Sequence, residues 1–80
     1  MMCVYRIKNK VNCKVYIGST INYTIRKNHH LRSLKLNTHH NHRLQKDFIK
    51  FKENTFEFEI LELVNCRELL LDTEQKHIDK

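Results

Sequence analysis

The chain has 80 residues, which is the size of one small domain with a single hydrophobic core. Apolar residues make up 40% and charged residues 30% of it. No uncharged stretch approaches the roughly 20 residues of a bilayer-spanning helix, so we expect no membrane partner. Lys and Arg number 15 against 9 Asp and Glu, a formal net charge of +6. This balance favours a polyanionic partner, and charge alone does not choose among nucleic acid, an acidic protein and a membrane surface. The basic residues are scattered and do not form one basic amphipathic helix, so a membrane-surface role is set aside as well.

The amino terminus lacks an apolar segment followed by a small-residue cleavage site, so a secretory signal is not expected. We therefore predict an intracellular location, which means the cytoplasm, or the nucleus or a virus-associated site if the source is a eukaryote or a virus. In such a reducing compartment the cysteines Cys3, Cys13 and Cys66 are expected to be free thiols.

The first half of the chain reads as a hairpin followed by a helix. Two short runs of β-branched and aromatic residues, 3–8 and 14–19, predict antiparallel strands joined by a turn. Asn22 is a suitable cap for a helix over about 23–35. Successive steps of 100° bring one set of side chains onto a common face of that helix: Tyr23, Lys27, His30, Leu31 and Leu34.

The second half contains a helix, a strand and a final helix. Residues of about 40–52 carry a core stripe at helical spacing, and 55–63 alternates with period two, which predicts a strand. The element order is then β-β-α-α-β-α, a single α+β domain with a small three-stranded antiparallel or mixed sheet flanked by helices. The expected inward side chains are Leu44, Phe48 and Phe51 of the helix and Phe56, Phe58 and Ile60 of the strand.

The last helix, over about 66–80, is predicted to place Leu70, Leu71 and Ile78 on one apolar stripe that faces the core. Glu74 and His77 fall inside this stripe.

Glu74 is the first candidate functional residue. An inward carboxylate costs several kcal/mol unless a cation, a metal ion or hydrogen bonds compensate it. Two interpretations stay open on the pattern alone: a structural ion pair with Arg26 or Lys27, or a metal site.

Two further pairs of residues point to chemistry on an anion. Arg26 and His30 are four residues apart on one helix face, so both can address the same anion, and a guanidinium suits phosphate oxygens. Tyr5 and Tyr16 lie one in each predicted strand. A phenol titrates near 10 and needs a neighbouring cation or metal-linked water to act as a base near neutrality. Taken singly, these side chains also fit a solvated helix face and ordinary packing.

The linear pattern joins these signals. Cys3-Val4-Tyr5, then Tyr16-Ile17-Gly18-Ser19, then Arg26 and His30, resemble the signature of the GIY-YIG endonucleases. The likeness continues through 39–45, 55–62 and 74–79, so it covers essentially the whole chain.

The resemblance implies that 1–80 is a GIY-YIG-like nuclease domain, a metal-dependent endonuclease that hydrolyses DNA phosphodiester bonds. It implies Mg²⁺ or Mn²⁺ as the metal, DNA as the partner and no small-molecule cofactor; it leaves the oligomeric state open. Water is the expected nucleophile, activated through Tyr16 or the Tyr16–His30 pair. The implied catalytic residues are Tyr5, Tyr16, Arg26, His30 and Glu74, with Glu74 as metal ligand, and the implied DNA contacts are Lys14, Gly18, Arg32, His39 and His40.

Two rival hypotheses fit the same residues, and one position departs from the family pattern. The chain can be a nucleic-acid-binding module that keeps the fold but does not cleave, or a zinc-stabilised interaction domain that uses His39, His40 or His42 with a cysteine, although no CxxC spacing is present. Cys3 stands where the family has a glycine, and a glycine-specific backbone there would strain the first strand.

Overall fold

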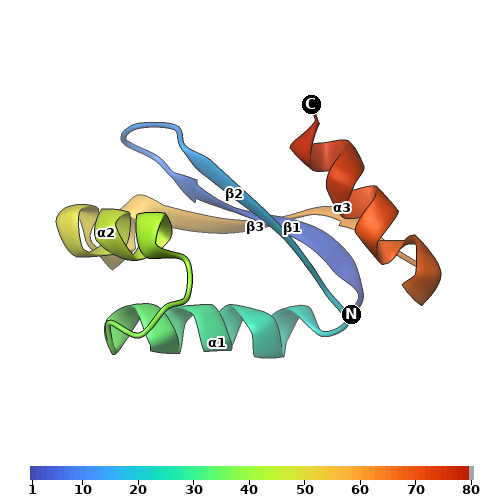
Figure 1. The fold of residues 1–80 in the computed structure, drawn as a ribbon, viewed down its shortest axis with the longest axis horizontal. Coiled ribbons are helices and arrows are strands. Elements are labelled where there is room, and N and C mark those ends of the chain that lie inside the picture. Colours follow the sequence, from blue (N-terminus) through green and yellow to red (C-terminus); the bar gives the residue numbers. More distant parts are fainter. Residues whose placement is uncertain (80) are drawn as a thin grey trace.

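The computed structural model describes residues 1–79 as three strands and three helices (Figure 1). The sheet is antiparallel throughout, in the order β2-β1-β3, so the first strand lies at its centre. The predicted α+β class and element order are confirmed. The elements are β1 (Cys3–Asn9), β2 (Val15–Thr20), α1 (Tyr23–Lys35), α2 (His42–Phe51), β3 (Phe56–Leu63) and α3 (Leu70–Ile78), with short 3-10 turns at Glu53–Thr55 and Arg67–Leu69.

Side-chain caps set where α1 and α2 begin. The Asn22 side chain accepts a hydrogen bond from the Ile25 backbone N–H (3.2 Å), as predicted for α1. Asn41 caps α2 in the same way through the Leu44 N–H (3.1 Å), which starts this helix two residues later than predicted. The helix ends at Phe51, because the next residue, Lys52, has a positive φ of 71° that breaks the helical repeat.

The hydrophobic core lies between one face of the sheet and the helices α1 and α2. Figure 1 shows α1 along that side of the sheet, with α2 and α3 at opposite ends of the molecule. The predicted inward residues of β3 pack against this core, although they are only partly buried. The buried cluster is Cys3, Tyr5 and Ile7 of β1 with Leu34, Leu44 and Phe48 of the helices; Tyr16, Tyr23, Phe56, Phe58 and Ile60 pack around it.

Cys3 is fully buried in this core, and its backbone is not among those with positive φ. A side chain at this position therefore causes no backbone strain, and the thiol fills core volume. All three cysteines are free thiols, as predicted. No helix in residues 1–79 is long and apolar enough to cross a membrane.

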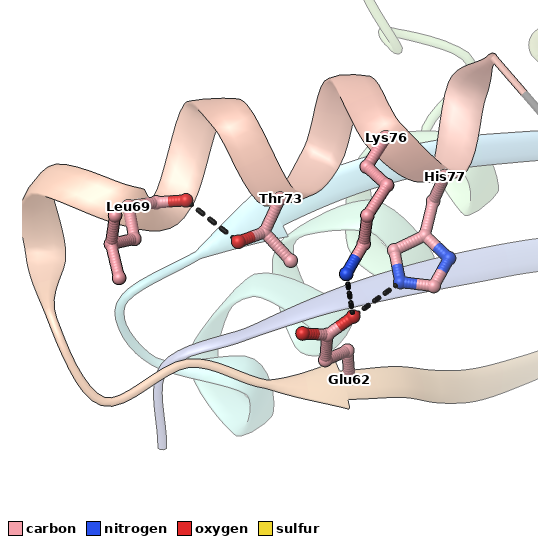
Figure 2. Close-up of polar contacts among 5 residues, drawn as sticks. All are labelled: Glu62, Leu69, Thr73, Lys76 and His77. Atoms are coloured by element: carbon pink, nitrogen blue, oxygen red, sulfur yellow. Dashed lines mark hydrogen bonds and ion pairs between the residues drawn. The ribbon is translucent and has the colours of Figure 1, made fainter.

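Polar contacts set how α3 rests on the sheet (Figure 2). Glu62 of β3 accepts from both Lys76 Nζ (3.0 Å) and His77 Nε2 (2.9 Å). These contacts hold the pKa of the Glu62 carboxyl below its usual value, through the Lys76 and then the His77 hydrogen bond. At the start of the helix, Thr73 Oγ1 donates to the Leu69 carbonyl (2.7 Å). One carboxylate therefore fixes two successive positions of α3.

The predicted apolar stripe of α3 is wrong. Leu71 and Ile78 are 74% and 48% exposed, and only Leu70 is half-buried. Glu74 and His77 lie on the side turned toward the sheet, as predicted, and Thr73 joins them; all three are half-buried. The contacts of Lys76 and His77 with Glu62 lie on this side of the helix, whereas Leu71 and Ile78 lie outside it. The helix predicted from residue 66 begins instead as the 3-10 turn Arg67–Leu69, and α3 follows from Leu70. Residue 80, the predicted end of this helix, lies outside the described residues.

The orientation of α3 can be tested by making the same change on two helices. Leu34→Ala removes a side chain that is 2% exposed, so the free energy of unfolding should fall by about 2–5 kcal/mol. Leu71→Ala removes one that is 74% exposed and should cost less than about 0.5 kcal/mol. Urea denaturation followed by circular dichroism measures both. A loss at Leu71 as large as that at Leu34 would place Leu71 in the core after all.

Candidate active site

A cavity of about 220 Å³ opens beside β2, the strand at one edge of the sheet. All five residues predicted to be catalytic line it, although they come from β1, β2, α1 and α3. Three of the predicted DNA contacts, Gly18, His39 and His40, line it as well. The complete lining is Tyr5, Ile7, Tyr16, Ile17, Gly18, Ser19, Arg26, His30, His39, His40, Asn41, Leu44 and Glu74.

Gly18 lets the Tyr5 ring lie directly against β2. The two residues are paired in the strand register, so their side-chain positions share one face of the sheet. A Cβ added at Gly18 would lie 2.6 Å from Tyr5 Oη and 2.7 Å from Cζ, far inside van der Waals contact. The backbone φ of Gly18 is not positive, so the site requires the missing side chain rather than a glycine-specific conformation.

Two residues of α1 converge on the Tyr5 hydroxyl. Tyr5 is 3% exposed, and its Oη lies 2.6 Å from His30 Nε2. Arg26, one helical turn earlier, donates from Nε to the same oxygen over 3.4 Å. Burial raises the pKa of Tyr5, and the Arg26 hydrogen bond opposes this only in part. Arg26 and His30, predicted to share one helix face, thus both form hydrogen bonds to the Tyr5 hydroxyl oxygen beside the cavity.

His30 and His39 form a buried imidazole pair. They are 8% and 5% exposed, and His30 Nδ1 lies 2.7 Å from His39 Nε2 with the rings stacked at 5.0 Å. Burial, followed by the neighbouring His39, Arg26 and His40, lowers the pKa of His30 to about 4. Burial and His40 also lower the pKa of His39. Both rings are therefore neutral at neutral pH.

Gln45 holds the loop that carries His39. Its Oε1 accepts from the His39 backbone N–H (3.1 Å), and its Nε2 donates to the Leu34 carbonyl (3.0 Å). Gln45 is itself buried, so both hydrogen bonds are shielded from water. The loop between α1 and α2 is thereby tied to the carboxyl end of α1.

Tyr16 is bonded to an acid rather than to a histidine. Its Oη donates to Asp47 Oδ2 of α2 (2.8 Å). Burial first, and then the hydrogen bond and charge of Asp47, raise the pKa of Tyr16 to about 12. The phenol therefore stays protonated at neutral pH. The partner of His30 is Tyr5, so the structure does not bring together the Tyr16–His30 pair considered from sequence.

Glu74 reaches the cavity from α3 and is half-buried. Its carboxylate accepts a hydrogen bond from Ser19 Oγ of β2. The ion pair with Arg26 or Lys27 considered from sequence is not formed among residues 1–79, where Lys27 Nζ instead lies 5.5 Å from the Phe58 ring centre.

The oxygen donors at this point suit a hard cation. Mg²⁺ is commonly held by one or two carboxylates together with water and substrate phosphates, and Glu74 with the neighbouring Ser19 hydroxyl provides such a partial shell. Within the described part of the chain, no group of three or more His, Cys, Asp or Glu side chains is able to hold a metal ion by itself. The zinc-stabilised alternative thus has no ligand set in residues 1–79.

The remaining predicted DNA contacts lie outside the cavity. Lys14 lines a wider groove of about 620 Å³ that also carries cations of α2, and Arg32 lines a separate hollow beside His29. The groove adjoins the cavity, because Asp47 lines the groove and binds Tyr16 of the cavity. Its lining is Lys14, Arg43, Lys46, Asp47, Ile49 and Lys50.

Four site residues were given no role from the sequence: Ser19, Asn41, Gln45 and Asp47. Asp47 had a signal, because it is the single acidic residue of the basic α2 segment. Asn41 had one as a helix cap. Ser19 stands in the signature run and Gln45 in the 39–45 stretch, but the sequence did not show their contacts, because their partners lie on other elements.

Comparison with known proteins agrees with this architecture. The family model described as GIY-YIG catalytic domain matches residues 1–80. Intron-associated endonuclease 1 of Enterobacteria phage T4 is 36% identical over 72 residues, which are 89% of this chain and 29% of that protein. The chain therefore spans less than a third of the length of this curated relative.

Solved structures give the same result. The catalytic domain of the homing endonuclease I-TevI superposes with a TM-score of 0.89 at 32% identity, covering 99% of this chain and 86% of that one. A mutant of the I-TevI catalytic domain gives 0.88 at 33% identity, covering 98% and 80%. The match thus extends over sequence and fold together. The chain belongs to the GIY-YIG family of endonuclease catalytic domains.

Proposed function

We propose that this domain is a metal-dependent endonuclease that hydrolyses DNA phosphodiester bonds in the cavity beside β2, acting inside the cell or in association with a virus. The observation that carries the proposal is the convergence of a guanidinium, a carboxylate, two phenols and an imidazole on one cavity. A phosphodiester in hydrolysis accumulates negative charge on its oxygens, and preorganised donors and cations stabilise such charge.

Arg26 is proposed to bind the scissile phosphate. It takes part in none of the ion pairs among residues 1–79, and its one side-chain hydrogen bond there, to Tyr5, uses Nε. The terminal nitrogens of the guanidinium are thus available to phosphate oxygens in the paired geometry that a lysine does not offer.

Glu74 is proposed to hold Mg²⁺ or Mn²⁺ together with phosphate oxygens and water. A bound ion of this kind supplies positive charge at the phosphate and makes nearby water more acidic. Ser19 orients the Glu74 carboxylate through its hydroxyl, and the contacts at Glu62 fix the helix that carries Glu74.

The two phenols are proposed to act as hydrogen-bond donors to the phosphate or to the attacking water. Asp47 and burial raise the pKa of Tyr16, and burial raises that of Tyr5, so both keep their protons at neutral pH. This favours positioning over proton abstraction, which revises the expectation that Tyr16 or a Tyr16–His30 pair activates the water.

The groove along α2 is proposed to carry the DNA backbone that flanks the cleavage point. Four cationic side chains, Lys14, Arg43, Lys46 and Lys50, line it with one carboxylate, Asp47. Lys and Arg contacts to phosphates position a duplex without reading its sequence. The contact of Arg32 with DNA, from its separate hollow, stays a prediction.

Cleavage of supercoiled plasmid tests the enzyme. The purified chain should nick or linearise plasmid with Mg²⁺ or Mn²⁺ and should do neither with EDTA. Arg26→Ala and Glu74→Gln should each lower the rate about 100-fold or more, because each removes charge stabilisation in the transition state. Circular dichroism reports whether these variants fold.

The matched controls are Arg67→Ala and Asp72→Asn, which make the same types of change at exposed positions outside the cavity. Both should cut at the wild-type rate. A folded wild-type protein that binds DNA without cutting it, whichever metal is supplied, would instead support the non-cleaving binding module.

The DNA footprint can be read from the salt dependence of binding in the Glu74→Gln background, where cutting is suppressed. For B-DNA, the logarithm of the association constant falls with that of the salt concentration by about 0.9 per phosphate contact. Lys14→Ala and Lys46→Ala should each reduce this slope by about one, and Arg67→Ala should leave it unchanged. Fluorescence anisotropy with a labelled duplex measures the slopes; equal slopes for all variants would remove the groove from the footprint.

A further inference from the structure

Three side chains of the cavity form a hydrogen-bonded row that ends on a backbone amide. The Asn41 N–H lies 3.0 Å from His39 Nδ1, His39 Nε2 lies 2.7 Å from His30 Nδ1, and His30 Nε2 lies 2.6 Å from Tyr5 Oη. A backbone N–H is always a donor, whereas each imidazole nitrogen is a donor or an acceptor according to the tautomer. The amide therefore sets the direction of the whole row.

The direction follows step by step. His39 Nδ1 accepts from Asn41, so the one proton of the neutral ring is on Nε2, which donates to His30. His30 Nδ1 accepts that bond, so its proton is also on Nε2, and it donates to Tyr5 Oη. The reverse direction would leave His39 with two accepting nitrogens and no proton, an anionic imidazolate that a buried site near neutral pH does not sustain.

We propose that His39, anchored by the Asn41 amide, is a positioning residue that fixes the tautomer of His30 and so directs the hydroxyl proton of Tyr5 into the cavity. Tyr5 Oη already accepts from His30 Nε2 and from Arg26 Nε, so its own O–H is left to donate to a ligand. This inference rests on the proposed nuclease function only for the identity of that ligand, a phosphate oxygen or the attacking water.

The same row excludes one role for the imidazole pair. The nitrogen of His30 that faces Tyr5 carries a proton, and so does the nitrogen of His39 that faces His30. Neither can accept a proton arriving from the cavity unless both tautomers change, and the Asn41 amide opposes that change. The pair thus presents a fixed donor and does not serve as a general base.

The surroundings keep both rings in the required neutral form. Burial and the cationic or titratable groups around His30 oppose a positive charge on it and so lower its pKa. Burial and His40 lower the pKa of His39 in the same way. Gln45 holds the His39 backbone, which keeps the anchoring amide in place. The groups that face His30 are Tyr5 of β1, Arg26 and His29 of its own helix, and His39 and His40 of the following loop.

The tautomers can be measured directly by long-range ¹H–¹⁵N correlation of the histidine rings in the labelled wild-type protein. The expected result is that His30 and His39 are both protonated at Nε2 and unprotonated at Nδ1 at pH 7.5. A Nδ1 proton on His30 would overturn the inference. This readout needs no substrate, so it decides the inference even if the protein does not cut DNA.

Two substitutions at His39 link the tautomer to catalysis. His39→Gln retains an amide N–H that can donate to His30 Nδ1, whereas His39→Phe keeps a stacked ring without any donor. In His39→Phe the His30 proton should move or exchange between nitrogens, and cleavage should fall about 10- to 100-fold, the range typical for residues that orient a functional histidine. His39→Gln should restore the Nε2 tautomer and much of the rate.

Two results would contradict the inference. The first is that His30 keeps its Nε2 tautomer in His39→Phe. The second is that His39→Gln restores this tautomer but cuts DNA no faster than His39→Phe. Loss of cutting in the wild type, with the tautomers as expected, would count against the nuclease proposal alone.

Acid pH should destabilise the imidazole pair. The folded pKa of His30 is about 4, against 6.5 for an unfolded histidine, so the unfolded chain binds the extra proton between these values. The contribution of the neutral His30 ring is complete above pH 6.5 and is lost as the pH falls, with the unfolding equilibrium constant rising by up to about tenfold per pH unit; the lowered pKa of His39 adds to this in the same direction. Urea titrations between pH 7 and 5 should give a shallower dependence for His39→Phe, which lacks one ring; an identical dependence would show that His39 does not titrate in this way.

Discussion

The close approach of the Tyr5 ring to the backbone of Gly18 is the constraint on which the site depends. The central strand of a three-stranded sheet normally places its aromatic side chains in the core, out of reach of solvent. Because Gly18 has no side chain, the phenol lies directly against β2 and its oxygen borders the cavity, while the residue as a whole is only 3% exposed. The same oxygen then becomes the meeting point for Arg26 and His30 of α1. A residue of the core is thus also a residue of the candidate active site.

Electrostatic balance divides the site into a cationic, a neutral and an anionic part. Arg26 provides fixed positive charge, and Glu74 provides an acceptor on the opposite element. The same cavity is lined by imidazoles kept neutral by burial and by each other, and by phenols kept protonated by burial and, for Tyr16, by Asp47. Groups that do not change charge near neutral pH present constant hydrogen-bond donors, which is the arrangement that stabilises charge developing on a phosphate without reorganisation.

The third helix shows how a catalytic domain this small holds a functional carboxylate without burying an apolar face. Its contact with the sheet is largely polar: Glu62 binds Lys76 and His77, and Ser19 binds Glu74. Such contacts are weak in exposed settings, but they are directional, and the metal ligand proposed at Glu74 needs direction more than it needs burial. Leu71 and Ile78 of this helix stay exposed, so polar contacts rather than apolar burial set its position on the sheet.

Local order in the sequence determined the elements of this protein. The period-two run of β3, the asparagine caps of α1 and α2 and the helical spacing of the α1 face depend on residues within a few positions of one another, so they could be read directly. The family signature likewise named the five residues that the fold gathers in one cavity. The tertiary structure alone decided the contact of α3 with Glu62, the pairing of Tyr5 with His30, and the bonding of Tyr16 to Asp47. Each of these depends on a partner from a distant element, Glu62, His30 or Asp47, and a hydrogen bond between side chains that far apart in sequence leaves no periodic trace in either segment.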